Sequence, residues 1–418
     1  MNNGTVQKKR VVVTGFGLVT PVGNTTEDTW SAILAGKSGF SRTSQFISLD
    51  GLGVGGVCEV KDFDAKALLG RREARRRDRF QQIACVAANE ALAQSGLQIT
   101  DENRTRVGCF VGTGTGGIQS TIAAEHALQN GGARKVSPFA VPMIMPNGAA
   151  GLIAIDHGIQ GPSLTTTTAC AAGSDGVGQG FRAITHGWVD AAVVGGTEAP
   201  LTRMTVAGFS QAGALSVRSD GTPSPFDKDR DGLIPGEGTG MLVIESLEHA
   251  QARGATILGE IIGYGATTDA FHVTAPPEDG SGAGRAITAA ITEAGITGAD
   301  IDYINAHGTG TRLNDEAETK SIKLALGEDA YNIPISSTKS MTGHIMGGTG
   351  AIEAVFCLLA MRDSVVPPTI NLVEFDPACD LTYIANEAKR DVNIDIATTH
   401  AFGFGGHNSV LVLKKFAG

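Results

Sequence analysis

The sequence predicts an α/β protein made of two related halves. Short apolar runs rich in β-branched residues alternate with longer segments of helical periodicity, which is the pattern of buried sheets covered by helices. Glycine is unusually frequent, at 57 of 418 residues, so many tight turns and close backbone contacts are expected. Three glycine-containing strings of the first half recur in the same order in the second half, which favours an internal duplication.

Each predicted element follows from its local pattern. The segment 79–95 carries apolar side chains at helical spacing, and Ser95-Gly96 marks its end because glycine favours the position after the last helical turn. Apolar runs bounded by turn residues predict six strands, at 10–17, 107–114, 191–196, 259–265, 301–308 and 409–415.

The repeated strings place residues of the two halves opposite each other. They are 15–17 with 263–265, 112–115 with 308–311, and 169–173 with 343–347. Under a pseudo-twofold axis, Cys170 and His344 then occupy equivalent places at the starts of two helices. We therefore divide the chain into halves 1–257 and 258–418. The first half carries extra residues, which we interpret as an inserted basic helix at about 61–96.

Composition excludes several classes of protein. The formal net charge of −10 argues against a general nucleic-acid binder. The six cysteines include no CxxC pair and no compact Cys/His cluster, so we expect free thiols, a reducing compartment and no metal site. No apolar stretch reaches about 18 residues, so we expect a cytoplasmic protein without a membrane span.

Two motifs imitate ligand sites without completing them. Gly112-x-Gly114-x-x-Gly117 resembles a dinucleotide fingerprint, but no second strand with an acidic residue follows about 20 positions later. The run from Asp227 to Asp231 resembles a calcium loop that lacks glutamate at its last ligand position. We therefore expect neither a nucleotide cofactor nor a bound calcium ion.

Cys170 has the setting of a reactive thiol. A threonine-rich strand pattern precedes it and small residues follow it, which places the thiol near a helix N-terminus. There the helix dipole and free N–H groups favour the thiolate. The alternative is a buried inert cysteine, a description that fits Cys85, Cys109 and Cys357 better because they lie within apolar segments. The pattern alone leaves both interpretations open for Cys170.

Two histidines and a glycine-rich turn complete the candidate site. His307 and His344 both lie where a predicted strand passes into a helix. A cysteine with two histidines suits acyl transfer, because the thiol carries the acyl group while the imidazoles polarise an oxygen and manage protons. The turn that contains Phe402 and Phe404 is either a plain turn or a source of N–H donors for a reacting carbonyl.

These strings together resemble the β-ketoacyl-[acyl-carrier-protein] synthases, specifically the elongating, type II-like members of that family. The similarity runs almost end to end, from VVVTGFGLVTPVGN through TTACAAGS, PFDKDRDGLIPGEG, INAHGTGT and SSTKSMTGH to FGFGGHN. The resemblance implies a thiolase-like fold, in which two duplicated α/β halves stack as five layers (α-β-α-β-α), and a homodimer. It also implies fatty-acid chain elongation without a redox or metal cofactor.

The resemblance assigns catalytic roles by matching motifs. Cys170 matches the nucleophile that takes the acyl chain from carrier-protein phosphopantetheine. His307 and His344 match the pair that assists decarboxylation of malonyl-carrier protein and stabilises the enolate. Lys339 matches the lysine near the second histidine, and Glu353 matches the acid that supports this network.

Further roles follow from the same match. The N–H groups of Cys170 and Phe404 form the implied oxyanion hole, and Phe404 with the neighbouring Phe402 forms a gate. Thr309 and Thr311 match threonines that bind the pantetheine arm. Thr115 matches a position that lines the acyl pocket and helps to set chain length.

A basic segment is the expected docking surface for an acidic acyl carrier protein. Residues 71–79 hold six arginines, of which Arg72, Arg75, Arg76 and Arg79 would share one helix face. The alternatives are a solvated helix face and an RNA-binding patch.

Other positions modify this expectation. The resemblance adds Arg134 and Lys135 as carrier contacts. It also reveals one departure, because Gly213 stands where the family often has a basic residue. The carrier contact is therefore expected to be reduced there, or adapted to a particular carrier.

Three other functions fit parts of the sequence. A biosynthetic thiolase generally has a second cysteine at the C-terminal glycine-rich turn, whereas Cys379 is remote from that turn. A non-catalytic chain-length partner of polyketide synthases would lack Cys170. A ketosynthase dedicated to a polyketide or another secondary metabolite keeps every catalytic residue, so it stays open beside fatty-acid elongation.

Overall fold

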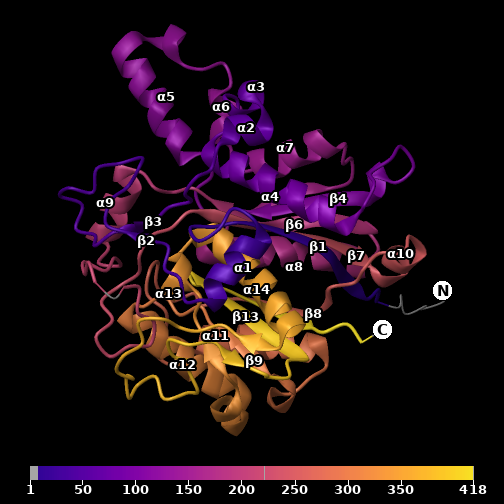
Figure 1. Ribbon diagram of the computed structural model, residues 1–418, viewed down its shortest axis with the longest axis vertical. Helices are drawn as coiled ribbons and strands as arrows, with labels where there is room; N and C mark the ends of the chain where they lie inside the picture. The colour runs from indigo at the N-terminus through magenta and orange to yellow at the C-terminus, as the bar shows by residue number, and fades with distance from the viewer. Residues whose placement is uncertain (1–7, 221, 418) are drawn as a thin grey trace.

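The computed structural model describes residues 8–220 and 222–417, and a sheet of ten strands runs through it (Figure 1). In hydrogen-bonded order the strands are β10 (Ile335–Ser336), β9 (Tyr303–Asn305), β13 (Ile396–Gly403), β14 (His407–Lys414), β8 (Gly259–Thr268), β1 (Val11–Val19), β7 (Gly238–Ser246), β6 (Ala191–Glu198), β4 (Val107–Gly112) and β5 (Ser163–Thr166). Two short ribbons accompany it, β2 (Phe40–Ser41) with β3 (Val57–Cys58) and β11 (Val365–Val366) with β12 (Lys389–Arg390).

The strand order confirms the internal duplication. β1 and β8 pair in antiparallel fashion over the short stretch from Val11 to Val13, at the middle of the order. Outward from this centre, β7, β6, β4 and β5 on one side correspond to β14, β13, β9 and β10 on the other. The pairing directions also agree, because the first two steps are antiparallel and the outer two are parallel in both halves.

The helices form three layers around the two halves of the sheet (Figure 1). On the outer faces lie α4 (Arg79–Ser95) and α7 (Gly148–His157) for the first half, and α11 (Ser281–Ala294) and α12 (Arg312–Leu326) for the second. The middle layer consists of α8 (Ala172–Thr185) and α14 (Thr349–Asp363), which each contact strands of both halves. The five-layer α-β-α-β-α arrangement expected from the family resemblance is therefore confirmed.

The remaining helices lie around this core. They are α1 (Thr26–Leu34), α2 (Ala65–Leu69), α3 (Arg71–Ala74), α5 (Ile118–Gly131), α6 (Ala140–Ile144), α9 (Arg203–Gln211), α10 (Leu247–Ala252) and α13 (Lys339–Thr342). Within the two described ranges, no helix has the length and hydropathy that a membrane span requires.

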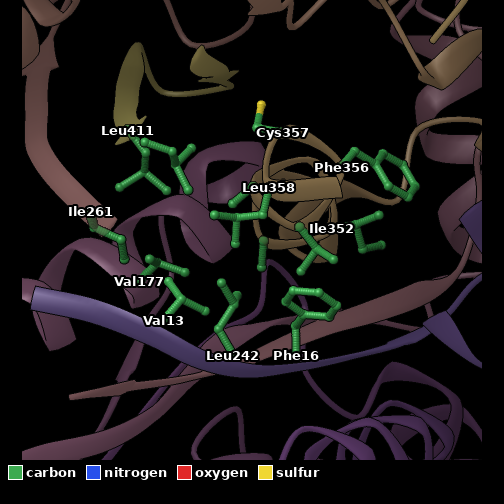
Figure 2. Packing of buried hydrophobic residues seen from close by; sticks show 14 of the residues in the cluster. Val13, Phe16, Val177, Leu242, Ile261, Ile352, Phe356, Cys357, Leu358 and Leu411 are labelled. Atoms are coloured by element: carbon green, nitrogen blue, oxygen red, sulfur yellow. The ribbon is translucent and has the colours of Figure 1, made fainter. Parts of the chain in front are cut away.

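The buried helix α14 lies at the centre of the hydrophobic core. Ile352, Phe356 and Leu358 of this helix pack against strand residues that include Phe16 of β1 and Leu242 of β7 (Figure 2). All of these side chains are at most 3% exposed, and α14 is buried from Thr349 to Met361, as expected for a helix enclosed between two sheets.

Glycines at the starts of α8 and α14 allow the two helices to approach closely. A Cβ atom on Gly173 would lie 2.6 Å from the carbonyl oxygen of Gly347, and a Cβ on Gly350 would lie 2.1 Å from the Ser174 hydroxyl oxygen. Real Cβ atoms do not approach other atoms so closely, so these positions require glycine. This contact brings the residues that precede both helices to one place.

The structure confirms one helix and corrects the interpretation of the basic segment. The helix predicted at 79–95 is α4, and Gly96 ends it in the left-handed conformation. It packs on β1 as α11 packs on β8, so it belongs to the duplicated core and is not an insertion. The segment 61–96 is therefore not one inserted helix: it contains α2 and α3 as well, and Asp78 separates α3 from α4.

Asp78 ends the arginine-rich stretch because it caps the N-terminus of α4. Its side chain accepts a hydrogen bond from the Phe80 N–H, while the Gln81 side chain accepts one from the Asp78 N–H. This reciprocal cap begins a new helix at Arg79, so the stretch 71–79 is not one continuous helix.

Arg79 consequently has a different role from the other arginines. It does not share a helix face with Arg72, Arg75 and Arg76, so that part of the sequence-based prediction was wrong. The Arg79 guanidinium instead pairs with the buried Glu237 at 2.7 Å.

Candidate active site

A cavity of about 420 Å³ is lined by residues from both halves of the chain. Cys170 and Phe209 come from the first half, and His307, His344 and Phe404 come from the second. The structure thus brings together the cysteine and both histidines that the sequence singled out. Other lining residues include Phe402, Thr309, Thr311, Gly213, Arg312 and Leu313.

Cys170 occupies a single 3₁₀ turn, Ala169–Ala171, immediately before α8. The matching histidine, His344, lies just before the 3₁₀ turn Met346–Gly348 that leads into α14. The residues before each also share a positive φ, since Ala169 has φ of 51° and Gly343 has φ of 67°. A left-handed alanine is strained, so surrounding contacts hold this turn in place.

The thiol of Cys170 faces the imidazole of His344, with 3.0 Å between Sγ and Nε2. Nδ1 of His344 accepts a hydrogen bond from the Met346 N–H at 3.3 Å and lies 3.2 Å from the Thr349 hydroxyl. Because Nδ1 is an acceptor, a neutral His344 carries its proton on Nε2. The ring therefore presents an N–H donor to the sulfur and to any group that binds beside it.

The expected stabilisation of a thiolate at Cys170 is outweighed by burial. Burial raises the pKa of this thiol to about 12, although the positive charge of Lys339 and the N–H groups of Phe404 and Cys170 oppose the rise. Both N–H groups therefore lie close enough to the sulfur to act on its pKa. In the resting protein the thiol is protonated at neutral pH.

Both cavity histidines are neutral at physiological pH. Burial lowers the pKa of His307 and of His344 well below the usual value, and the Lys339 charge lowers both further. Their rings lie 5.3 Å apart, edge to face. Two neutral imidazoles at this spacing act as hydrogen-bond donors and can hold one developing oxyanion between them.

Lys339 and Glu353 form a buried ion pair behind the histidines. The lysine Nζ lies 2.7 Å from the Glu353 Oε1, and their side chains are 1% and 2% exposed. Burial raises the pKa of Glu353 to about 7, while Lys339 acts in the opposite direction. The pair lies on α13 and α14, close enough for the Lys339 charge to lower the pKa of Cys170.

The glycine-rich turn after β13 carries the two phenylalanines. The Phe404 ring packs against Phe209, with ring centroids 6.0 Å apart, and the Phe402 ring lies 5.7 Å from that of His307. The hydroxyls of Thr309 and Thr311 lie 2.9 Å apart on the cavity wall.

Thr115 does not line this cavity. It is exposed, and its hydroxyl donates to the carboxylate of buried Glu198 at 2.7 Å. The same carboxylate accepts from the N–H groups of Gly114 and Gly347, so it joins the two halves beside the cavity. The N–H groups of Gly114 and Thr115, in the sequence that resembled a dinucleotide fingerprint, are therefore occupied by a side chain of the protein.

The basic residues lie on the surface away from the cavity lining. The Arg76 guanidinium carbon lies 4.5 Å from the centroid of the Phe139 ring. This contact connects the end of α3 with the segment that follows α5. The exposed members of this surface are Arg72, Arg75, Arg134 and Lys135.

Arg77 is structural and does not belong to this basic surface. It is buried, and its guanidinium forms a bidentate pair with Asp156 at 2.6 and 2.7 Å. Some of the six arginines in the stretch 71–79 therefore form ion pairs inside the protein, and the others have side chains that are exposed to solvent.

The sequence patterns did not single out Glu318, which supports His307 directly. Its carboxylate accepts hydrogen bonds from the N–H groups of His307 and Gly308, both at 2.7 Å. Asp315, three residues earlier on α12, accepts in the same way from the Thr309 N–H at 3.1 Å. Two acids at this spacing on the helix that follows HGTGT are a signal that could have identified both residues.

Comparison with known proteins agrees with this geometry. The model of the β-ketoacyl synthase N-terminal domain matches residues 8–250, and that of the C-terminal domain matches residues 258–373. The 3-oxoacyl-[acyl-carrier-protein] synthase 2 of Synechocystis sp. is 48% identical over 98% of this chain and 99% of its own length. The enzyme of the same name from Staphylococcus aureus is also 48% identical, over 98% and 99% of the two chains.

Solved structures show the same similarity. A β-ketoacyl synthase from Burkholderia phymatum is 35% identical and superposes with a TM-score of 0.90 over 98% of this chain and 100% of its own. A type II PKS ketosynthase, solved in complex with its acyl-carrier protein, is 34% identical with a TM-score of 0.89 over 98% and 100% of the two chains. The protein therefore belongs to the β-ketoacyl synthase family of acyltransferases.

Proposed function

We propose that the protein is a 3-oxoacyl-[acyl-carrier-protein] synthase that extends fatty-acid chains by decarboxylative condensation. The observation that carries this proposal is the meeting of Cys170, His344 and His307 in one cavity, with Nε2 of His344 3.0 Å from the thiol. The identity to the 3-oxoacyl-[acyl-carrier-protein] synthase 2 enzymes named above supports it over the whole chain.

Acyl transfer is the first step of the proposed reaction. The Cys170 sulfur attacks the acyl thioester of the carrier protein, and the N–H groups of Cys170 and Phe404 receive the carbonyl oxygen as it becomes negative. The acyl group moves to Sγ, the bond to the pantetheine sulfur breaks, and the proton of the thiol leaves with the pantetheine thiol.

Condensation follows when malonyl-carrier protein enters the same cavity. Its carboxyl carbon leaves as CO₂, and the electron pair of the broken bond forms an enolate on the thioester. His307 and His344 donate to the enolate oxygen, since both are neutral and His344 presents Nε2–H. The enolate carbon attacks the acyl carbonyl, the bond to Sγ breaks, and 3-oxoacyl-carrier protein is released. The Cys170 thiolate left behind takes a proton from solvent and returns to the resting thiol.

Other features of the protein are proposed on the same basis. Thr309 and Thr311 offer hydroxyls to the amides of the pantetheine arm, because both line the cavity that also holds Cys170. The reaction as written uses neither a redox cofactor nor a metal ion. A role of Thr115 in chain length and a cytoplasmic location remain predictions, and the free thiols of the described residues suit a reducing compartment.

The surface formed by Arg72, Arg75, Arg76, Arg134 and Lys135 is the proposed carrier-protein contact. Complementary charge mainly accelerates association and weakens with salt. The variant with Arg72, Arg75 and Arg76 changed to Glu is expected to raise the KM for acyl-carrier protein and to leave pantetheine thioesters unaffected. An unchanged KM for the carrier would reject the contact, and tight RNA binding by the unaltered protein would favour the RNA alternative.

A homodimer is proposed through the face at the β5 end of the sheet. Large apolar side chains are exposed on β5 and on helices connected to it by successive contacts: Leu128, Val141, Met145, Ile155 and Leu164, of which Ile155 is 76% exposed. β5 pairs only with β4, so its other edge is free in the described structure. An apolar face beside a free strand edge is suited to pairing with a second copy of the chain.

Fatty-acid elongation is favoured over a dedicated polyketide pathway by the degree of similarity. The fatty-acid type enzymes reach 48% identity, whereas the type II PKS ketosynthase reaches 34%. Both classes keep Cys170 and the two histidines, so substrate preference separates them.

A direct assay tests the proposed function. The protein is incubated with malonyl-carrier protein and a series of saturated acyl-carrier proteins, and the products are identified by mass spectrometry. We expect 3-oxoacyl-carrier protein two carbons longer than the acyl donor, with no product from Cys170→Ala and normal product from the control Cys357→Ala. Failure of the unaltered protein to extend any saturated donor would reject fatty-acid elongation.

A further inference from the structure

A third buried histidine lies next to the site without lining the cavity. His400 lies on β13, two residues from Thr398 and two from Phe402. The three side chains therefore lie on the same face of the strand. It is 0% exposed in a strand that also contributes apolar residues to two core clusters. A buried imidazole costs stability unless its nitrogens have partners, so its presence needs a specific explanation.

The two nitrogens of His400 face different groups. Nε2 lies 3.2 Å from the Thr398 hydroxyl oxygen, and Nδ1 lies 3.4 Å from Oε1 of Glu318. The second contact is a charge–dipole contact and not an aligned hydrogen bond. The Glu318 carboxylate accepts from two backbone N–H groups and so acts as an acceptor. The consistent tautomer therefore has the proton on Nδ1, on the side of Glu318, while Nε2 accepts from the Thr398 hydroxyl.

The two cavity histidines are held in different ways. His344 is fixed by contacts of its own ring nitrogen with Thr349 and Met346. Nδ1 of His307 is buried and has no hydrogen-bond partner among the described residues, so no such contact fixes its ring. The position of His307 depends instead on its backbone, which Glu318 holds, and on its ring packing against Phe402.

His400 contacts both of these supports. Its Nδ1 faces Glu318, and its ring lies 5.7 Å from that of Phe402, which in turn lies 5.7 Å from the ring of His307. We propose that His400 is a positioning residue for His307 and acts through Glu318 and Phe402. This inference rests on the proposed function, because it concerns the step in which His307 stabilises the enolate.

The proposal separates the two half-reactions. His307 has no described contact with the Cys170 thiol, whereas His344 does. Loss of the His400 contacts is therefore expected to slow malonyl decarboxylation while acylation of Cys170 continues. A residue that served stability alone would affect both half-reactions through the amount of folded protein.

Three substitutions distinguish the nitrogens of His400. Leu removes both, Asn places an amide N–H near the position of Nδ1, and Gln reaches instead toward the position of Nε2 and the Thr398 hydroxyl. We expect His400→Leu and His400→Gln to lower kcat for CO₂ release from malonyl-carrier protein about tenfold, the scale of one lost polar contact to a charged group. We expect His400→Asn to stay within about threefold of the unaltered protein.

Acylation of Cys170 and KM for malonyl-carrier protein are measured in the same variants. Both should change less than about twofold, because neither depends on His307 in this proposal. His249→Leu is the matched control, since His249 also pairs with a glutamate, at 2.6 Å from Glu245, but lies on α10 outside the cavity. It should leave every rate unchanged.

Several results would overturn the inference. These are unchanged decarboxylation in both His400→Leu and His400→Gln, equal loss of acylation and decarboxylation, or His400→Asn no better than His400→Gln. If His400→Leu does not fold, the comparison of the Asn and Gln variants decides. Absence of decarboxylation in the unaltered protein would instead reject the proposed function, so the two failures are distinguishable.

Discussion

Replacing Lys339 by Met should make the free energy of unfolding fall above pH 7, because of the Glu353 carboxyl group. In the unaltered protein, the effect of Glu353 on stability has levelled off at that pH. Lys339 is the partner of Glu353 in a pair whose side chains are 1% and 2% exposed. Removing the ammonium leaves a carboxyl group inside the core with no cation beside it. Breaking a buried pair in this way costs about 3–5 kcal/mol when the remaining group stays charged.

The pH dependence follows from the raised pKa of Glu353. With Lys339 present this pKa is about 7, above the usual 4.5, so the folded protein holds a proton that the unfolded chain has lost between these values. Stability due to this group is therefore present below pH 4.5 and is lost as pH rises toward 7, where the loss levels off. Without Lys339 the pKa rises further, so the variant continues to lose about 1.4 kcal/mol per pH unit above pH 7.

Denaturant unfolding at pH 6, 7, 8 and 9 measures this difference. The gap in unfolding free energy between the unaltered protein and Lys339→Met should widen from pH 7 to pH 9 by up to about 3 kcal/mol. The double variant Lys339→Met/Glu353→Gln should show no widening, because the titrating group is gone. Lys37→Met, at an exposed lysine, is the control. A gap of equal size at all four pH values would contradict this explanation.

Three further predictions concern catalysis, packing and assembly. His307→Ala and His344→Ala should lose condensation far more than acylation of Cys170, measured separately by product mass and by acyl-enzyme mass; equal losses would contradict the assigned roles. Gly173→Ala should destabilise the fold by several kcal/mol, seen as a lower thermal midpoint, because its Cβ would lie 2.6 Å from a carbonyl oxygen. Leu164→Arg should convert a sedimenting dimer to monomer, and a monomeric unaltered protein at micromolar concentration would reject the dimer.

Much of the fold could be predicted because the periodic patterns are strong and the halves repeat. α4 begins and ends where its apolar spacing and Gly96 place it. The match of 169–173 with 343–347 places Cys170 opposite His344, and the two side chains are in contact. The sequence repeat therefore predicted a contact between residues 174 positions apart.

Other features depend on tertiary contacts that no local pattern shows. The high pKa of Cys170 results from burial, which outweighs the donors that the helix start provides. The break before α4 is different, because the cap formed by Asp78 and Gln81 is a local pattern that the prediction from the arginines alone overlooked. Glu318 and His400 are separated in sequence and become partners only when α12 packs near β13.

Locating the acyl group tests the proposed chemistry most directly. The protein is incubated with an acyl-carrier protein alone, digested and mapped by mass spectrometry, and malonyl-carrier protein is then added to a second sample. We predict an acyl mass on the peptide that contains Cys170, and its disappearance on addition of malonyl-carrier protein as 3-oxoacyl product forms. An acyl group on another of the six cysteines, or one that malonyl-carrier protein does not discharge, would contradict the proposed chemistry.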